Sequence, residues 1–225
     1  MSGVLIGFAG ISLAFAIATR LLTGSDSSPV PALRLATGQL ALQLPILIAV
    51  RWFLRWHGTD WSRAFGPVWS PRAWAFGVGT GLAAVVFGYP LQFAVAKGLL
   101  ALGREPQSQE AVLILMQSDW AGRFAIGALA IVGAAVAEEV LFRGIFYQAI
   151  RGSGRPRLAL WLTAFLFGAI HLNLAAFLPL ALFGAALAWL YERTGTLTAP
   201  IVAHATFNLV GFLAAIFPGT WFPTP

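Results

Sequence analysis

Charged residues are scarce in this chain of 225 residues, of which 10% are charged and 59% are hydrophobic. A soluble globular domain has about a quarter of its residues charged. The scarcity of charge, with a mean hydropathy of +0.80, therefore favours an integral membrane protein. The chain also lacks a long polar stretch that would build a separate soluble domain, so we expect one transmembrane domain over 1–225.

Cysteine is absent as well. Its absence excludes disulfides, thiolate metal sites and cysteine nucleophiles. The net charge of +6 is not gathered with aromatic residues on a soluble face. It therefore predicts a membrane topology and affinity for anionic membrane lipids, and we expect no nucleic-acid partner. No basic residue precedes the first apolar stretch, so we expect that stretch to be a retained helix and not a cleaved signal.

Seven apolar segments are long enough, or nearly so, to cross the hydrocarbon layer, which takes roughly 18 residues. They are approximately 3–22, 32–54, 73–98, 121–150, 158–173, 175–191 and 196–217. Membrane lipid admits only helices or closed barrels, and these runs are too long and too uniformly apolar for barrel strands. The sequence predicts an all-α bundle of about seven or eight transmembrane helices. The stretch 109–117 is either an interfacial helix or part of an eighth span.

Basic residues predict the orientation of the chain. They gather in the second loop (Arg55, Arg63, Arg72) and in the fourth loop (Arg151, Arg155, Arg157). The positive-inside rule then puts the second, fourth and sixth loops in the cytoplasm, with the N-terminus inside. An odd number of spans would leave the C-terminus outside.

A few polar and ionisable residues interrupt the C-terminal apolar segments. They are Glu138, Glu139 and Arg143 in the fourth segment, His171 in the fifth, and His204 and Asn208 in the seventh. Ionisable groups are costly within a membrane, so each is a candidate functional residue. Counted along the helices from the cytoplasmic loops, these groups lie at similar depths. We therefore expect 121–217 to hold the catalytic core helices.

Helix geometry separates the two glutamates. Glu139 and Arg143 are four residues apart with the acid first, which is the favourable order for an ion pair on one face. Glu138 lies about 100° around the helix from Glu139. The simplest interpretation is that Arg143 neutralises Glu139 and leaves Glu138 free to act as a general base. His204 and Asn208 are also four apart and share a face.

These residue types suit hydrolysis of a peptide bond. Glu138 could activate water, while His171, His204 and Asn208 could either bind a metal or donate hydrogen bonds to an oxyanion. His171, His204 and Glu138 together are a plausible zinc set, although no H-E-x-x-H motif is present. The sequence leaves the metal and the metal-free routes open.

Other interpretations compete with catalysis. Glu139 and Arg143 could be a purely structural pair, and Glu138 could serve a proton-coupled transporter. Membrane histidines often make interhelical hydrogen bonds, as in a non-enzymatic immunity or scaffold protein. The four-residue spacing of Gly77 and Gly81 indicates close packing of helices.

The motifs, in their order and spacing, resemble those of a known family. Glu138-Glu139-x-x-x-Arg143, Phe167-x-x-x-His171 and His204-x-x-x-Asn208 are similar to the motifs of the CPBP (CAAX-prenyl-protease and bacteriocin-processing, or Abi) intramembrane peptidases. The resemblance covers roughly 138–208.

The resemblance implies a bundle of about eight helices and an intramembrane endopeptidase of the metallo- or glutamate-dependent type. Glu138 would activate the water, Glu139 and Arg143 would support it, and His171, His204 and Asn208 would complete the site. The substrate would be a membrane-associated, lipidated or CAAX-like protein or peptide. We accordingly expect the cytoplasmic (inner) membrane of a bacterium as its location.

Overall fold

The computed structural model describes residues 31–106 and 109–217, and every regular element in these ranges is a helix. The predicted all-α class is therefore confirmed. The first predicted span, 3–22, and both ends of the chain lie outside the described residues.

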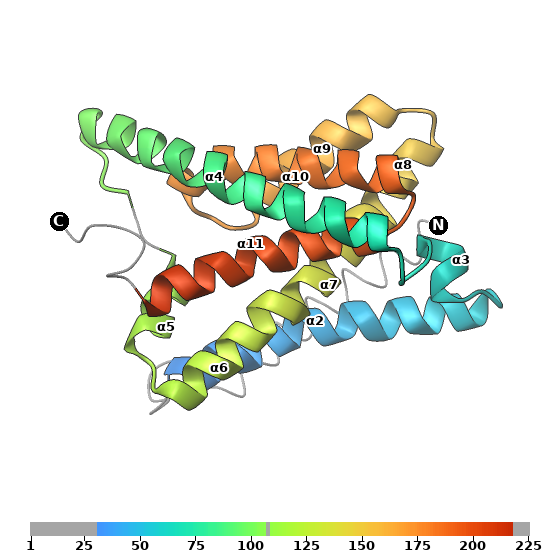
Figure 1. Cartoon of the computed structure of the whole chain (residues 1–225), viewed down its shortest axis with the longest axis horizontal. Coiled ribbons are helices and arrows are strands. Elements are labelled where there is room, and N and C mark those ends of the chain that lie inside the picture. Colours follow the sequence, from blue (N-terminus) through green and yellow to red (C-terminus); the bar gives the residue numbers. More distant parts are fainter. Residues whose placement is uncertain (1–30, 107–108, 218–225) are drawn as a thin grey trace.

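The helices follow one another with short connections (Figure 1). They are α2 (Pro31–Trp56), α3 (Trp61–Phe65), α4 (Pro71–Ala101), α5 (Glu110–Gln117), α6 (Trp120–Ala128), η1 (Leu129–Ala134), α7 (Ala135–Glu139), η2 (Val140–Tyr147), α8 (Gln148–Gly152), α9 (Pro156–Ala169), α10 (Leu174–Thr194) and α11 (Thr198–Ile216). The two η segments are π-helices. From α6 to α8 the chain runs as one continuous helix, Trp120–Gly152.

Five helices in the described part of the chain are long and apolar enough to cross a membrane. They are Pro31–Trp56, Pro71–Ala101, Trp120–Gly152, Leu174–Thr194 and Thr198–Ile216. Each coincides closely with a predicted apolar segment. The chain is therefore an integral membrane protein.

The fifth predicted span, 158–173, is shorter in the structure. α9 has 14 residues, about 21 Å at 1.5 Å per residue, whereas the hydrocarbon core is roughly 30 Å thick. The chain then turns at Leu172, whose φ is 50°, and the Asn173 side chain caps α10. The predicted helix is therefore too long, and His171 lies in the turn between α9 and α10 and not within a helix.

The stretch 109–117 is also resolved by the structure. α5 has eight residues, which is about 12 Å and too short to cross the membrane. Asp119 then caps α6 by accepting a hydrogen bond from the Gly122 amide. α5 is therefore a short helix at one end of the bundle and not part of a spanning helix.

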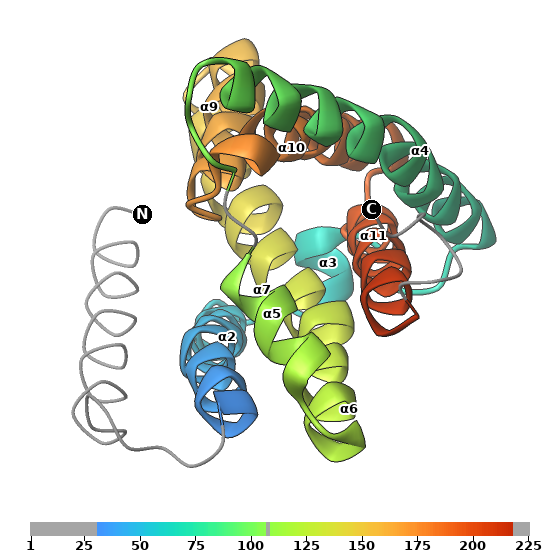
Figure 2. The same ribbon diagram turned by 90° about the vertical axis from the view of Figure 1, so that its left-hand side faces the viewer.

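The helix α11 lies between two groups of helices (Figures 1 and 2). On one side it contacts α4 and α10, and on the other it contacts η1 and α7. α2 packs along the far side of the Trp120–Gly152 helix. This arrangement places α11, which carries His204 and Asn208, directly against the segment that carries the two glutamates.

Glycines bring α4 and α11 close together. A Cβ atom on Gly77 would lie 2.7 Å from the Ala199 carbonyl oxygen, and one on Gly81 would lie 2.5 Å from that of Ala203. Side chains at these two positions would collide with the α11 backbone. The close packing predicted from the spacing of Gly77 and Gly81 is confirmed.

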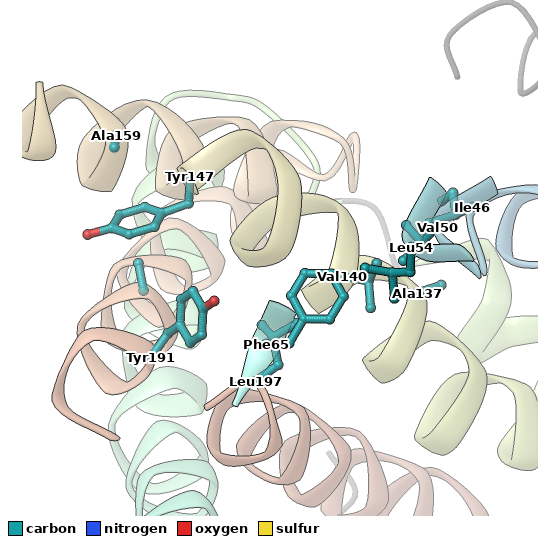
Figure 3. Packing of buried hydrophobic residues seen from close by; sticks show 11 residues of the cluster. Ile46, Val50, Leu54, Phe65, Ala137, Val140, Tyr147, Ala159, Tyr191 and Leu197 are labelled. Carbon is teal, nitrogen blue, oxygen red and sulfur yellow. The ribbon is translucent and has the colours of Figure 1, made fainter. Parts of the chain in front are cut away.

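The second, fourth and sixth loops gather at one end of the bundle. The Leu197 amide donates to the Phe65 carbonyl at 2.8 Å, and Arg151 pairs with Glu192 at 3.4 Å. Figure 3 shows Phe65 between Val140 and Leu197 in the buried cluster below these loops. The three loops predicted to share a side of the membrane therefore do share one end of the structure.

Candidate active site

The helix that carries the glutamates changes its winding twice. η1 precedes α7, which ends with Glu138 and Glu139, and η2 follows with Arg143. A π-helix holds more residues per turn than an α-helix, and such segments occur frequently at functional sites. This winding was not predicted from the sequence, because no proline stands in 120–152 to mark it.

Glu139 and Arg143 form a buried ion pair in the site. Arg143 Nη1 donates to Glu139 Oε1 at 2.8 Å, and both side chains are fully buried. Arg143 Nη2 donates to the Gly184 carbonyl of α10 at 2.7 Å. The guanidinium also lies over the Phe167 ring, 4.8 Å from its centroid. The predicted pair of Glu139 with Arg143 is confirmed, and it also joins the fourth predicted span to α10.

Glu139 also orients His204. The Nδ1 atom of His204 lies 2.9 Å from Glu139 Oε1. Because a carboxylate oxygen only accepts hydrogen bonds, Nδ1 carries the proton of this bond. The neutral ring then has its lone pair on Nε2. A carboxylate that fixes the tautomer of a histidine in this way is common in hydrolytic sites.

Glu138 faces the other side of the same imidazole. Its Oε2 atom lies 4.0 Å from His204 Nε2, which is too far for a direct hydrogen bond. This oxygen is buried and has no hydrogen-bond partner, although the side chain as a whole is 26% exposed. Glu139 Oε2 is also buried without a partner, but the Glu139 side chain is fully buried. Of the two glutamates, Glu138 is therefore the more accessible to a reactant.

Asn208 lies one turn along α11 from His204, and its Nδ2 donates to the Ala130 carbonyl of η1 at 2.7 Å. A carboxamide has two N–H donors. This bond takes one of them and leaves the second.

His171 approaches the group through an aromatic ring. Its Nδ1 lies 2.7 Å from the Phe167 carbonyl oxygen, so Nδ1 donates and Nε2 bears the lone pair of the neutral ring. The Phe167 ring centroid is 5.2 Å from that of His171 and 5.5 Å from that of His204. Phe167 is fully buried, so its ring packs between helices and is not exposed to a reactant. The structure thus brings Glu138, Glu139, Arg143 and His204 together, and the Phe167 ring contacts both His204 and His171.

The residues proposed for zinc do not form a three-ligand group. A catalytic zinc takes three protein ligands and one open position. Within 31–106 and 109–217, no group of three His, Cys, Asp or Glu side chains could hold a metal ion. The Nδ1 atom of His204 donates to Glu139 and leaves Nε2 free, but no third side chain joins His204 and Glu138 in such a group. The set His171, His204 and Glu138 therefore does not fit a zinc ion as these residues are arranged.

A polar residue that the sequence analysis did not single out contacts the same helix. Gln43 of α2 is buried, and its Nε2 donates to the Leu129 carbonyl of η1 at 3.3 Å. A signal for it was present, because Gln39 and Gln43 are two amides four residues apart in an otherwise apolar segment. Such a pair shares one helix face.

A separate cavity of about 280 Å³ lies at the loop end of the bundle, between α3, α8 and the end of α10. Polar residues line much of it, including Arg63, Gln148, Arg151 and Glu192. None of the predicted site residues lines this cavity. It is therefore distinct from the group around Glu138.

Comparison with known proteins agrees with this geometry. Residues 120–210 match the family model described as type II CAAX prenyl endopeptidase Rce1-like. The resemblance to the CPBP family is confirmed. The matched range begins with α6 and ends within α11, so it includes every residue of the three motifs.

A curated relative gives the same indication. The chain is 31% identical over 110 residues to the protein described as "Putative membrane peptidase YdiL" from Bacillus subtilis (strain 168). The aligned region covers 49% of this chain and 43% of that relative, so the match spans less than half of the relative's length. No solved structure matches the chain.

Proposed function

We propose that this protein is an intramembrane endopeptidase in which Glu138 activates the attacking water. The observation that carries the proposal is the buried, unpartnered Glu138 Oε2 beside His204 Nε2, with His204 held from behind by Glu139. The match to an endopeptidase family model supports the same class of reaction.

The 4.0 Å separation of Glu138 Oε2 and His204 Nε2 suits a bridging water. Two hydrogen bonds of about 2.8 Å to atoms this far apart meet at the water oxygen at about 90°, close to the angle between its two O–H bonds. In this position the water donates one proton toward each acceptor. Its oxygen is then left with lone pairs to attack a carbonyl carbon.

The reaction follows from these contacts. Glu138 accepts a proton from the water as the oxygen attacks the peptide carbonyl, which gives a tetrahedral intermediate. The protonated Glu138 then returns that proton to the leaving amine as the C–N bond breaks. One water is consumed, and the products are a new carboxyl and a new amine.

Three groups are candidates to stabilise the oxyanion. Asn208 keeps one N–H that the Ala130 bond does not use, so we assign the oxyanion contact to it first. His171 and His204 have their Nδ1 protons engaged and donate through Nε2 only when the ring is protonated. Glu139 and Arg143 are positioning residues, because they act through His204 and through the buried ion pair.

The proposed mechanism uses no protein-bound metal, because the zinc set is not assembled among the described residues. The proposed substrate is a membrane-associated protein or peptide, and the name of the matching family supports a lipidated, CAAX-like segment. Membrane lipids surround the helices, and we assign no nucleic-acid partner. We place the protein in the cytoplasmic membrane of a bacterium. We orient it with the second, fourth and sixth loops and the N-terminus inside and the C-terminus outside, because basic residues concentrate in the second and fourth loops.

The test is cleavage of fluorogenic, prenylated CAAX-type peptides by purified protein in lipid vesicles. Glu138→Gln should keep the fold and lower kcat by at least ~10³-fold, because an amide cannot take the proton from water. Glu105→Gln is the matched control, since Glu105 is exposed in a loop outside the site. Turnover should persist after chelation and in protein without stoichiometric zinc.

Three results would contradict the proposal. Glu138→Gln with wild-type turnover would remove Glu138 from the reaction. Activity that disappears on chelation and returns with zinc would show that the metal route is the real one. Ion flux through vesicles that depends on Glu138, without any cleavage, would favour a transporter.

A further inference from the structure

Two neighbouring carbonyls of the π-helix η1 accept hydrogen bonds from side chains of other helices. Gln43 Nε2 of α2 donates to the Leu129 carbonyl at 3.3 Å, and Asn208 Nδ2 of α11 donates to the Ala130 carbonyl at 2.7 Å. Both donors are carboxamides, and they approach from helices on different sides of η1. The start of η1 is therefore held between α2 and α11.

The winding of η1 gives these bonds a role. Where an α-helix widens into a π-helix, the backbone bond changes from i→i+4 to i→i+5, which moves the carbonyls of the wide turn away from their α-helical positions. A carbonyl oxygen has two lone pairs and can accept a side-chain bond beside its backbone bond. The two amides make such bonds to Leu129 and Ala130 where the π form places these carbonyls. They therefore favour the π form over a regular α-helix, in which the two carbonyls would lie elsewhere.

A glycine makes room for the Gln43 amide. The Gln43 side-chain oxygen lies where the Cβ of any larger residue at position 133 would be, so an alanine there would collide with it. Gly133 belongs to the same π-helix, one turn after Leu129. Gln43 and Gly133 therefore form one unit of packing, with the amide placed against the wide turn.

The wide turn sets where the glutamates point. α7, with Glu138 and Glu139, follows η1 directly. A regular α-helix turns by about 100° per residue. Removing the extra residue of a wide turn would thus rotate α7 by about that angle relative to α6. Glu139 would then leave His204, and Glu138 Oε2 would no longer face Nε2.

We infer that Gln43 is a positioning residue of the active site: with Asn208 it holds η1 in the π form, and this fixes the rotation of Glu138 and Glu139 toward His204. The inference rests on the proposed function for its consequence on catalysis. Gln43 itself is assigned no contact with substrate or water.

The experiment uses the full chain in lipid vesicles with three variants. Gln43→Leu removes the donor, and Gly133→Ala displaces the same amide from the other side. Gln39→Leu is the matched control, because Gln39 lies one turn earlier on α2 and its oxygen is buried without a partner. We expect Gln43→Leu and Gly133→Ala to lower kcat about tenfold or more with KM little changed, and Gln39→Leu to behave as wild type.

The losses of kcat caused by the two substitutions should also not be additive. Because both disturb one amide, the double variant Gln43→Leu/Gly133→Ala should be no worse than the worse single variant. Independent losses that multiply would contradict the shared unit. Wild-type kcat in Gln43→Leu would overturn the inference directly.

A second readout does not depend on activity. The chain has three histidines, so ring ¹⁵N signals can be assigned with a His204→Gln variant. Gln43→Leu should shift the His204 Nδ1 signal, which reports the bond to Glu139, and leave the signal of the exposed His57 unchanged. An unchanged His204 signal would refute the inference even if kcat fell. If wild type cleaves no peptide, the proposed function fails while this signal still tests the role of Gln43.

Discussion

The Arg143→Met substitution tests how strongly the buried ion pair supports the bundle. Arg143 and Glu139 are both fully buried, with 2.8 Å between Nη1 and Oε1. Removing one partner of such a pair leaves an uncompensated charge in an apolar interior, which costs about 3–5 kcal/mol. The Gly184 carbonyl also loses its donor, which would add to the loss. His204 still donates a hydrogen bond to Glu139, and this bond limits the destabilisation.

The expected destabilisation is therefore about 3–5 kcal/mol, measured as the free energy of unfolding in mixed detergent micelles. Arg63→Met is the matched control, because Arg63 pairs with Asp60 at 3.5 Å at the surface. An exposed pair of this kind contributes about 1 kcal/mol or less. The destabilisation caused by Arg143→Lys should lie between those of Arg143→Met and Arg63→Met. A lysine keeps the positive charge, but its ammonium lacks the planar fork that reaches Glu139 and Gly184 together.

The double variant Glu139→Gln/Arg143→Met separates charge from packing. It removes both charges, so no carboxylate is left unpaired, and we expect it to be more stable than Arg143→Met alone. Equal effects of Arg143→Met and Arg63→Met would refute the reasoning. A double variant less stable than Arg143→Met would show that lost packing, and not the orphaned charge, causes the effect.

Two further predictions concern packing and topology. Gly81→Ala should lower the unfolding temperature because its Cβ would collide with the Ala203 carbonyl, while Gly79→Ala, with open space at its Cβ, should be tolerated; equal effects would contradict the close packing of α4 on α11. Because the chain has no cysteine, Ser153→Cys and Arg104→Cys can each be labelled alone in intact cells: Arg104→Cys should react with an impermeant maleimide and Ser153→Cys should not, and the reverse pattern would invert the proposed orientation.

Much of the fold follows from local properties of the sequence. Five predicted segments are helices long and apolar enough to cross a membrane, because apolar length alone decides whether a segment can cross lipid. The pairing of Glu139 with Arg143 was also predictable, since a four-residue spacing puts two side chains on one face. The exception, α9, has an apolar sequence that continues past the helix end, so composition did not show where the turn begins.

The arrangement of the site depended on contacts between segments far apart in the chain. His204 could have been expected to face either glutamate, and only the packing of α11 against α7 sets its Nδ1 on Glu139 and its Nε2 toward Glu138. The position of His171 beside Phe167 depends on the turn after α9.

The sequence by itself thus determined that this is a helical membrane protein and which few polar residues stand in its apolar segments, because hydropathy and helical periodicity are local. The tertiary structure decided how the helices are rotated about their axes. The π-helix before Glu138, the contact of the Gln43 amide with Leu129 and the contact of Asn208 with Ala130 all depend on that packing. The physical reason is that a wide turn and a buried amide are stabilised only by partners on other helices.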